Sequence, residues 1–209
     1  MVTLLILTML TELKSFQVPL MLECPLSKRR HGMIEPLPFH PVYDHTYGGV
    51  MRASEDGLQR LGLDWIDILL AHDIGAFQYD DSNFKHFRDF PESGYKAMAE
   101  LRAEGCEKAI GLGANENEVC LDALAIGQCY EFLLAGRYMF LEQTPLDELF
   151  PACERAETTM ICGGLFNSGI LSGRKMWNHD AAPRSVIKKV RALAEVAKEF
   201  GIPLHAAAL

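Results

Sequence analysis

Four apolar runs alternate with amphipathic helical patterns in the chain after residue 47. The first run is nearly continuous and is interrupted only by Asp67. Runs without a regular polar alternation are typical of parallel strands that are covered on both faces. We therefore predict strands over residues 65–71, 109–113, 131–135 and 159–163, adjacent and parallel in that order.

The segments before these runs have helical spacing, and most of them end at a glycine. Gly62 follows the first segment and supplies a position that can adopt the positive φ of a helix end. The next helix is predicted to have Ser93 as its N-cap and to end at Gly105. The stripe of the first helix consists of Val50, Ala53, Ser54, Leu58 and Leu61.

Three further helices are predicted in the second half of the chain. Thr144 has the chemistry of an N-cap, and Pro145 suits the first helical position of a helix that runs to about Ala156. Pro183 opens the last helix, in which Val186, Val190, Leu193 and Ala197 lie on one stripe. The predicted helices span 119–126, 144–156 and 183–201, with Gly127 and Gly201 ending the first and the last.

Strands that alternate with helices form parallel βαβ units, which fit either an open doubly wound sheet or a (β/α)8 barrel. An open sheet that binds a dinucleotide normally carries G-x-G-x-x-G. Gly111 and Gly113 match its first half, but Glu116 stands at the third glycine, and the sequence has no GxxxxGK loop. We therefore predict an α/β fold, a partial (β/α)8 TIM barrel, although 209 residues are few for eight units.

Composition favours one ordinary globular domain and excludes a nucleic-acid surface. Apolar residues make up 49% of the chain, enough for one sizeable core. The net charge is −8 and the pI is about 5.4, whereas phosphate binding requires clustered Lys and Arg. The six cysteines are dispersed and form no CxxC pair, so we expect buried thiols in a reducing, cytoplasmic setting.

Residues 1–42 are predicted to stand apart from the barrel pattern. Residues 1–10 are almost wholly apolar, but they are too short to span a bilayer and lack the basic region and cleavage site of a secretory signal. A displaced strand or helix fits them better. Residues 19–41 contain five prolines and the basic run Lys28, Arg29 and Arg30, which indicates an irregular connector. We expect no membrane association.

His72 and Asp73 end the first apolar run abruptly. In parallel α/β architectures the carboxyl ends of strands are where ligands bind and chemistry occurs, so these polar residues are candidates for function. The alternative is a solvated strand end or a structural histidine. Both interpretations remain open on these residues alone.

Four motifs, read in order, resemble strands four to seven of an aldo-keto reductase, in the aldose dehydrogenase branch that includes L-fucose, D-threo-aldose and pyridoxal dehydrogenases. The motifs are LQRLGLDWIDILLAHD, AIGLGANE, LLAGRYMFLEQ and GGLFNSGILSG, and the resemblance covers about residues 43–209. It implies a (β/α)8 barrel that binds NAD or NADP without a Rossmann motif. It also implies hydride transfer between the nicotinamide and the carbonyl or lactol carbon of a small sugar or aldehyde such as D-threo-aldose, L-fucose, L-galactose or pyridoxal.

The resemblance assigns roles at matching positions. His72 matches the histidine that orients the substrate beside a catalytic tyrosine, and Asn115 matches the side chain that holds the nicotinamide carboxamide. Arg137 and Tyr138 would line the nicotinamide pocket. The following turn would offer backbone N–H groups to the pyrophosphate, through Gly163, Gly164, Phe166, Asn167, Ser168 and Gly169. Ordinary alternatives are a helix cap for Asn115 and a flexible strand-to-helix turn for residues 163–169.

The sequence departs from the family pattern in several places. Gly163 stands where the commoner pattern has a tyrosine that stacks on nicotinamide. Residues 44–48 resemble the motif D-x-x-x-x-Y-G, but Asp44 and Tyr47 are three positions apart instead of five. Lys28 lies in a proline-bounded run and not at a strand end. We expect a chain that is truncated at both ends relative to the family, with the eighth strand and the adenosine-side phosphate residues outside it.

Three functions remain open from the sequence. The first is an aldose dehydrogenase of the aldo-keto reductase type, and the second is an inactive barrel fragment that acts as a binding or scaffold module. The third is another barrel enzyme that uses His72 and Asp73 as an acid–base pair, or His40 and His45 as metal ligands. The scattered histidines disfavour the third, and we predict no metal. An opened barrel has unpaired strand edges, which require partners in the first 40 residues or in another chain, including self-association.

Overall fold

The computed structural model describes residues 5–6, 43–72, 74–76, 83–178 and 180–209. They contain a five-stranded parallel sheet in the order β1-β2-β3-β4-β5. The strands are β1 (Leu5–Ile6), β2 (Ile68–His72), β3 (Ala109–Ala114), β4 (Glu131–Ala135) and β5 (Thr159–Gly163). The predicted four strands are confirmed, as are their adjacency and their parallel direction.

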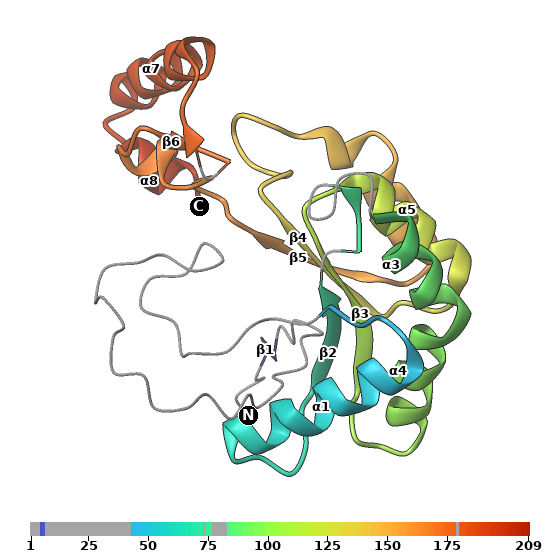
Figure 1. The fold of residues 1–209 in the computed structure, drawn as a ribbon. Helices are drawn as coiled ribbons and strands as arrows, with labels where there is room; N and C mark the ends of the chain where they lie inside the picture. The colour runs from blue at the N-terminus through green and yellow to red at the C-terminus, as the bar shows by residue number, and fades with distance from the viewer. Residues whose placement is uncertain (1–4, 7–42, 73, 77–82, 179) are drawn as a thin grey trace, which may run out of the picture.

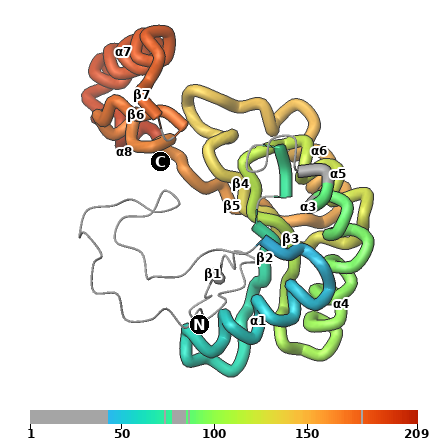
Figure 2. Tube along the Cα trace, in the orientation of Figure 1, coloured from blue at the N-terminus to red at the C-terminus, as the bar shows by residue number. Residues whose placement is uncertain are grey.

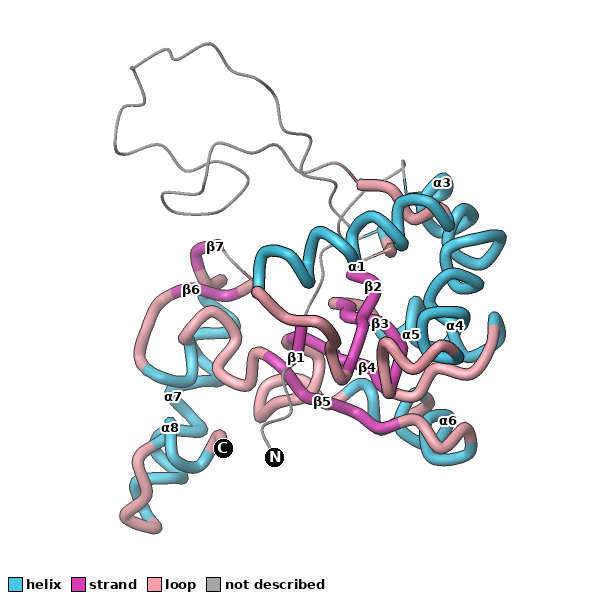
Figure 3. Tube along the Cα trace, turned by 90° about the horizontal axis from the view of Figure 1, so that it is seen from below, coloured by secondary structure: helices cyan, strands magenta, loops and turns pink. Residues whose placement is uncertain are grey.

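Helices cover one face of this sheet (Figure 1), as in the (β/α) units that the sequence predicted. They are α1 (Tyr47–Leu61), α3 (Asn83–Asp89), α4 (Tyr95–Ala103), α5 (Asn117–Ile126) and α6 (Leu149–Arg155). Figure 3 shows the same separation of helices and strands from below. The main hydrophobic core lies between the two layers, where alternate strand residues pack against the helices: Leu69, Ala71, Ile110, Leu112, Phe132 and Leu134.

The register of the sheet places the other alternate set on the opposite face. Leu70 pairs with Gly111 and His72 with Gly113, so His72 lies at the carboxyl end of β2 on the face away from the main core. Gly111 is required by the close approach of β4, because a Cβ at this position would lie 1.6 Å from the backbone oxygen of Glu131.

The short strand β1 pairs with β2, with Leu5 opposite Ile68 and Ile6 opposite Leu69. A strand within residues 1–10 was one of the two predicted outcomes, and the first 40 residues do supply a partner for one edge of the opened sheet. Among the described strands, β5 has a neighbour on one side only. The other residues of the 1–42 segment lie outside the described residues, as does Cys24.

The first strand begins later than predicted. Trp65 and Ile66 precede β2, and the Trp65 side chain is 47% exposed, with the Lys108 ammonium 4.6 Å from the centre of its ring. The apolar run therefore includes a covered loop residue, Ile66, and a tryptophan that takes part in a surface cation–π contact. Hydrophobicity alone did not distinguish these positions from the strand.

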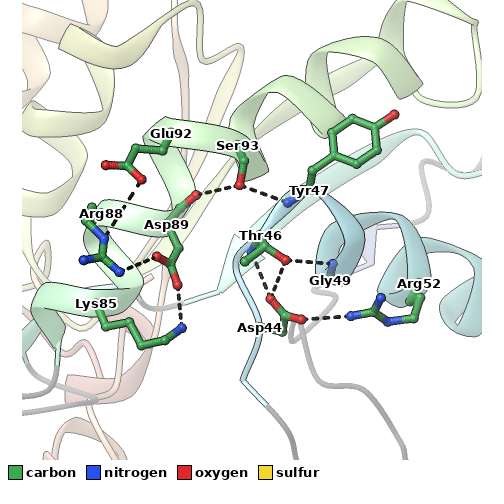
Figure 4. A network of polar contacts seen from close by, with 10 residues as sticks. All are labelled: Asp44, Thr46, Tyr47, Gly49, Arg52, Lys85, Arg88, Asp89, Glu92 and Ser93. Carbon is green, nitrogen blue, oxygen red and sulfur yellow. Dashed lines mark hydrogen bonds and ion pairs between the residues drawn. The ribbon is translucent and has the colours of Figure 1, made fainter.

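Ser93 does not cap the helix that was predicted to begin there. It lies in the π-helical turn η2 (Phe90–Gly94), between α3 and α4. Its hydroxyl donates to the Asp89 carbonyl at 3.2 Å and accepts from the Tyr47 N–H at 3.1 Å, so it satisfies an N–H group at the start of α1 instead (Figure 4). Gly94 lets this turn approach the preceding loop, because a Cβ there would lie 2.2 Å from the His45 oxygen.

Thr144 also differs from its predicted role. It begins the 3₁₀ turn η3 (Thr144–Leu146), and α6 starts only at Leu149. The Thr144 hydroxyl accepts a hydrogen bond from Asn117 Nδ2 at 2.9 Å, which links this turn to α5. The predicted helix ends at Gly62 and Gly105 are correct. Both glycines have a positive φ, of 65° and 84° respectively.

The C-terminal part forms a second, smaller cluster beyond the carboxyl end of β5 (Figure 2). It contains η4 (Ile170–Ser172), the hairpin β6 (Met176–Trp177) and β7 (Asp180–Ala181), α7 (Arg184–Glu199) and α8 (Leu204–Ala207). The predicted helix after Pro183 is confirmed as α7, and its Val186 and Val190 pack against a core that includes Ile170 and Leu171. None of the helices within the described residues has the length and apolar character needed to cross a membrane.

Candidate nucleotide site

A cavity of about 140 Å³ lies at the carboxyl ends of β3, β4 and β5, the edge at which parallel α/β folds bind ligands. Five residues that the sequence singled out line it together, namely Asn115, Arg137, Gly164, Asn167 and Ser168. Ala135, Gly136 and Asn178 complete the lining. The parallel register brings these segments to one place although they are far apart in sequence.

Asn115 directly follows β3 and precedes α5. The N-cap of α5 is Glu116, with an extended backbone and no capping hydrogen bond from its side chain. The alternative that Asn115 serves as the helix cap is therefore wrong. Its position at a strand end, partly buried and lining the cavity, matches the position expected for an amide that binds a ligand.

The turn after β5 has a left-handed backbone at several positions. Gly164 and Gly169 have φ values of 66° and 91°, and Asn167 and Ser168 have φ values of 37° and 55°. The Asn167 N–H donates to the Gly164 oxygen at 2.7 Å, and the Gly169 N–H donates to the Phe166 oxygen at 3.1 Å. Two of the amides expected to face a pyrophosphate are therefore engaged within the turn itself.

Side chains connect this turn to its neighbours. Asn167 is 4% exposed, and its amide exchanges two hydrogen bonds of 2.7 Å with residue 178, one to the Asn178 side chain and one from the Asn178 N–H. Arg137 donates to Glu142 Oε1 at 2.9 Å and to Asn178 Oδ1 at 3.2 Å. Its Nε is buried and has no hydrogen-bond partner among the described residues.

Glu142 and Asn178 are the functional candidates that the sequence analysis missed. Glu142 lies inside the motif LLAGRYMFLEQ, five residues after Arg137. The ion pair between them could therefore have been proposed from the sequence. Asn178 lies in the turn between β6 and β7 and belongs to no motif. Only the folding of the C-terminal hairpin against the turn after β5 brings it to the cavity.

His72 lies on β2, next to the strand that leads to Asn115, and its side chain is partly exposed. The His72 carbonyl lies 3.4 Å from Nε2 of the buried His45. Because a carbonyl only accepts, His45 Nε2 carries the proton in this contact. Asp73, the other half of the proposed acid–base pair, lies outside the described residues.

Four other predicted residues lie near the cavity without lining it. The Tyr138 ring packs edge-on against Phe150 with centroids 4.9 Å apart, and Phe166 packs in the C-terminal cluster. Gly163 ends β5 opposite Ala135, and Gly169 precedes η4.

Residues 44–46 precede α1, which begins at Tyr47 with Thr46 as its N-cap. Asp44 Oδ1 accepts from the N–H and the hydroxyl of Thr46, and Asp44 Oδ2 is paired with Arg52 at 2.8 Å (Figure 4). Tyr47 donates to Glu100 at 2.6 Å, and this hydrogen bond to a carboxylate raises the pKa of Tyr47 above its ordinary value. The contacts of Asp44 and Thr46 give this segment a structural role at the start of α1.

The metal-binding alternative gains no support from the part of the chain that is described, where no three His, Cys, Asp or Glu side chains are grouped so as to hold a metal ion. His40 lies outside the described residues.

Residues 37–209 match the profile of the Aldo/keto reductase family. The chain belongs to this family. Its sequence is 38% identical to pyridoxal 4-dehydrogenase of Microbacterium luteolum over 85% of the chain and 54% of that protein. It is 29% identical to D-threo-aldose 1-dehydrogenase of a Pseudomonas species over 80% of the chain and 50% of that protein.

Solved aldo-keto reductase structures agree with the fold. A glycerol dehydrogenase from Gluconobacter oxydans superposes with a TM-score of 0.60 and 16% identity, over 82% of this chain and 53% of that one. The holo form of an aldo-keto reductase from Bacillus halodurans gives 0.59 and 22%, over 79% and 52%. The chain spans about half the length of the curated relatives it matches, and its sheet is a partial (β/α)8 barrel.

Proposed function

We propose that this chain is the nicotinamide-binding part of an NAD- or NADP-dependent dehydrogenase of the aldo-keto reductase type. Its substrate would be an aldose or a related alcohol or aldehyde, such as D-threo-aldose, L-fucose, L-galactose or pyridoxal. The main support for the proposal is the cavity at the carboxyl ends of β3, β4 and β5. It brings together two residues expected at the nicotinamide, Asn115 and Arg137, and three expected at the pyrophosphate, Gly164, Asn167 and Ser168.

The lining fits a nicotinamide ring better than a whole dinucleotide. A cavity of about 140 Å³ is smaller than the roughly 300–1,000 Å³ of a site that encloses a drug-sized ligand. Its walls carry the amide group of Asn115 and the Nε of Arg137, which has no hydrogen-bond partner among the described residues, and these groups complement a carboxamide that both donates and accepts. When bound, the nicotinamide supplies the carbon that accepts or donates the hydride.

Residues of this chain would bind the cofactor and orient the substrate. Asn115 would hold the carboxamide, Arg137 would border the ring, and residues 163–169 would follow the phosphates. His72, at the end of the neighbouring strand, would orient the oxygen of the substrate by a hydrogen bond. We assign this work to residues 43–209, and we propose that residues 1–42 are a separate segment that contributes the edge strand β1.

The names of the two relatives, pyridoxal 4-dehydrogenase and D-threo-aldose 1-dehydrogenase, support the substrate class. Both substrates carry a carbon at which an alcohol or lactol loses hydride. The buried thiols of Cys129 and Cys153 suit the cytoplasmic setting that we propose, because burial raises the pKa of both and keeps them in the unreactive thiol form.

Saturation-transfer NMR on the cofactor tests this proposal. With NAD or NADP in excess over the 209-residue chain, we expect the strongest transfer to the nicotinamide protons and weaker transfer to the adenine protons. Asn115→Ala should reduce the nicotinamide signal, while Asn117→Ala on the first turn of α5 serves as the matched control. Transfer that is strongest at adenine, or none at all, would overturn the proposal and favour a module without cofactor.

A further inference from the structure

The two loops that border the cavity are held together by one pair of asparagine residues. Both polar atoms of the Asn167 side chain are bonded to residue 178, each at 2.7 Å, one through the Asn178 side chain and the other through its backbone N–H. Asn167 is almost fully buried. The pair therefore connects the turn after β5 to the turn of the C-terminal hairpin, and no strand pairing among the described residues makes this connection.

The backbone is strained on both sides of this pair. Four non-glycine residues within the described parts of the chain have a positive φ, and three of them line the cavity: Asn167, Ser168 and Asn178, with φ values of 37°, 55° and 47°. Such conformations persist where the surrounding structure holds them, and they concentrate at ligand sites. Asparagine tolerates the left-handed region better than most residues, which explains its use at two of the three positions.

Asn178 also restrains Arg137. The guanidinium donates from Nη2 to Asn178 Oδ1 at 3.2 Å and from Nη1 to Glu142 at 2.9 Å. These two bonds fix the plane of the group and leave Nε as a buried donor at the cavity, without a partner among the described residues. Buried N–H groups are almost always paired in native proteins, so this donor is suited to an acceptor that a ligand brings.

We infer that Asn178 is a positioning residue of the ligand site. It holds the turn of residues 164–169 in its left-handed conformation, and it sets the Arg137 guanidinium so that Nε donates to an oxygen of the bound ligand. The identity of that ligand as a nicotinamide nucleotide rests on the proposed function. The acceptor is a carboxamide or a phosphate oxygen, and both belong to such a nucleotide.

Hydrogen exchange of the chain without ligand tests the positioning role. Asn178→Ala removes the oxygen that accepts from Asn167 and Arg137, whereas Asn178→Asp keeps that oxygen and suits the positive φ. In Asn178→Ala we expect the N–H groups of residues 167, 169 and 178 to exchange about tenfold faster. In Asn178→Asp they should exchange nearly as in the parent. Amides of α7 report on the fold and should be unchanged in both.

Equal rates in the parent and Asn178→Ala would overturn the role of the pair. So would acceleration of the same size in both variants, since the aspartate retains the acceptor. If α7 amides also exchange faster in Asn178→Ala, the fold itself is disturbed, and the exchange rates are then measured in Asn167→Asp. This variant removes the Nδ2 donor of residue 167 and keeps the oxygen that accepts from the Asn178 N–H. In that variant the backbone amide of residue 178 should remain protected from exchange, and loss of this protection would contradict the inference.

The Nε–Hε NMR signal of Arg137 tests the second part of the inference, that Nε donates to an oxygen of the ligand. We expect it to shift when NAD is added, and separate additions of 1-methylnicotinamide and inorganic phosphate identify the acceptor as a carboxamide or a phosphate oxygen. If NAD perturbs Asn115 and leaves the Arg137 signal unchanged, the assignment of Nε is wrong. If NAD perturbs no signal at all, the proposed function fails, while the exchange rates of Asn178→Ala still decide the positioning role.

Discussion

At the scale of single residues, the clearest anomaly lies at the opposite end of the sheet from the cavity. Glu107 precedes β3 and is 2% exposed, with one carboxylate oxygen accepting from Ser54 at 3.2 Å. The other oxygen, Oε2, is buried and has no partner among the described residues. The pKa of Glu107 is raised to about 7, chiefly by burial; the Ser54 hydrogen bond opposes this shift, and the nearby charge of Glu104 adds to it.

This pKa predicts a pH-dependent stability. The folded state holds the Glu107 proton more tightly than the unfolded state, so the stabilising contribution is complete below the unfolded pKa of 4.5 and is lost as the pH rises to about 7. The expected loss is about 3 kcal/mol. Glu107→Gln should therefore flatten the fall in urea unfolding free energy between pH 5 and 8. An equally steep fall in the variant would show that another group titrates.

At the level of the elements, Gly111 allows β3 and β4 to approach each other closely. Gly111→Ala places a Cβ 1.6 Å from the Glu131 oxygen, so the strands must separate or the pairing must slip. We expect a loss of about 4 kcal/mol or more in unfolding free energy. Gly105→Ala is the matched control, because its Cβ meets no atom within 4 Å and its φ of 84° costs about 1–2 kcal/mol. Similar losses in the two variants, measured by thermal unfolding, would contradict this account of the sheet.

The sequence predicted the strands more accurately than the helix starts. Apolar runs identified β3, β4 and β5 within a residue. Of these three strands, only β3 has the expected cover on both faces, because alternate residues of β4 are half-buried and β5 has no buried residue. The helix starts at Ser93 and Thr144 were wrong, because their hydroxyls bond to groups on other elements, the Tyr47 N–H and the Asn117 amide. Such partners depend on tertiary contacts that local patterns do not contain.

The residues of the cavity were likewise only partly predictable from the sequence. Asn115 and Asn167 were found because they follow strands within motifs of a known family, and strand ends meet at one edge of a parallel sheet. Asn178 was missed because it reaches the cavity through a two-strand hairpin with no apolar periodicity. Tyr138 was expected at the pocket, but its ring lies against Phe150, where a large aromatic surface is available.

At the level of the whole molecule, the chain contains the candidates for orienting the substrate and for binding the cofactor. The sequence has no D-x-x-x-x-Y-G motif, and Tyr47 has a raised pKa. We therefore expect the purified 209-residue chain to oxidise L-fucose, L-galactose or pyridoxal with NAD at the background rate.

The assay is the appearance of NADH absorbance against a blank without protein. Clear turnover that His72→Ala abolishes would contradict this expectation and would mean that another residue donates the proton. Tyr138→Phe and Tyr47→Phe would then identify which tyrosine does so. Turnover that His72→Ala leaves intact would instead indicate a contaminating dehydrogenase.

Titrating NAD and NADP into the ¹⁵N-labelled chain tests whether the carboxyl ends of β3, β4 and β5 bind the nicotinamide nucleotide. We expect shifts at Asn115 and residues 163–169 that saturate only at millimolar cofactor. We expect weak binding because the chain spans about half the length of the curated relatives it matches. Each charge-assisted hydrogen bond that is missing relative to a whole site forgoes roughly 1.5–3 kcal/mol, and two of them move a micromolar site to the millimolar range. Shifts confined to other parts of the chain, or saturation at low micromolar cofactor, would contradict these expectations.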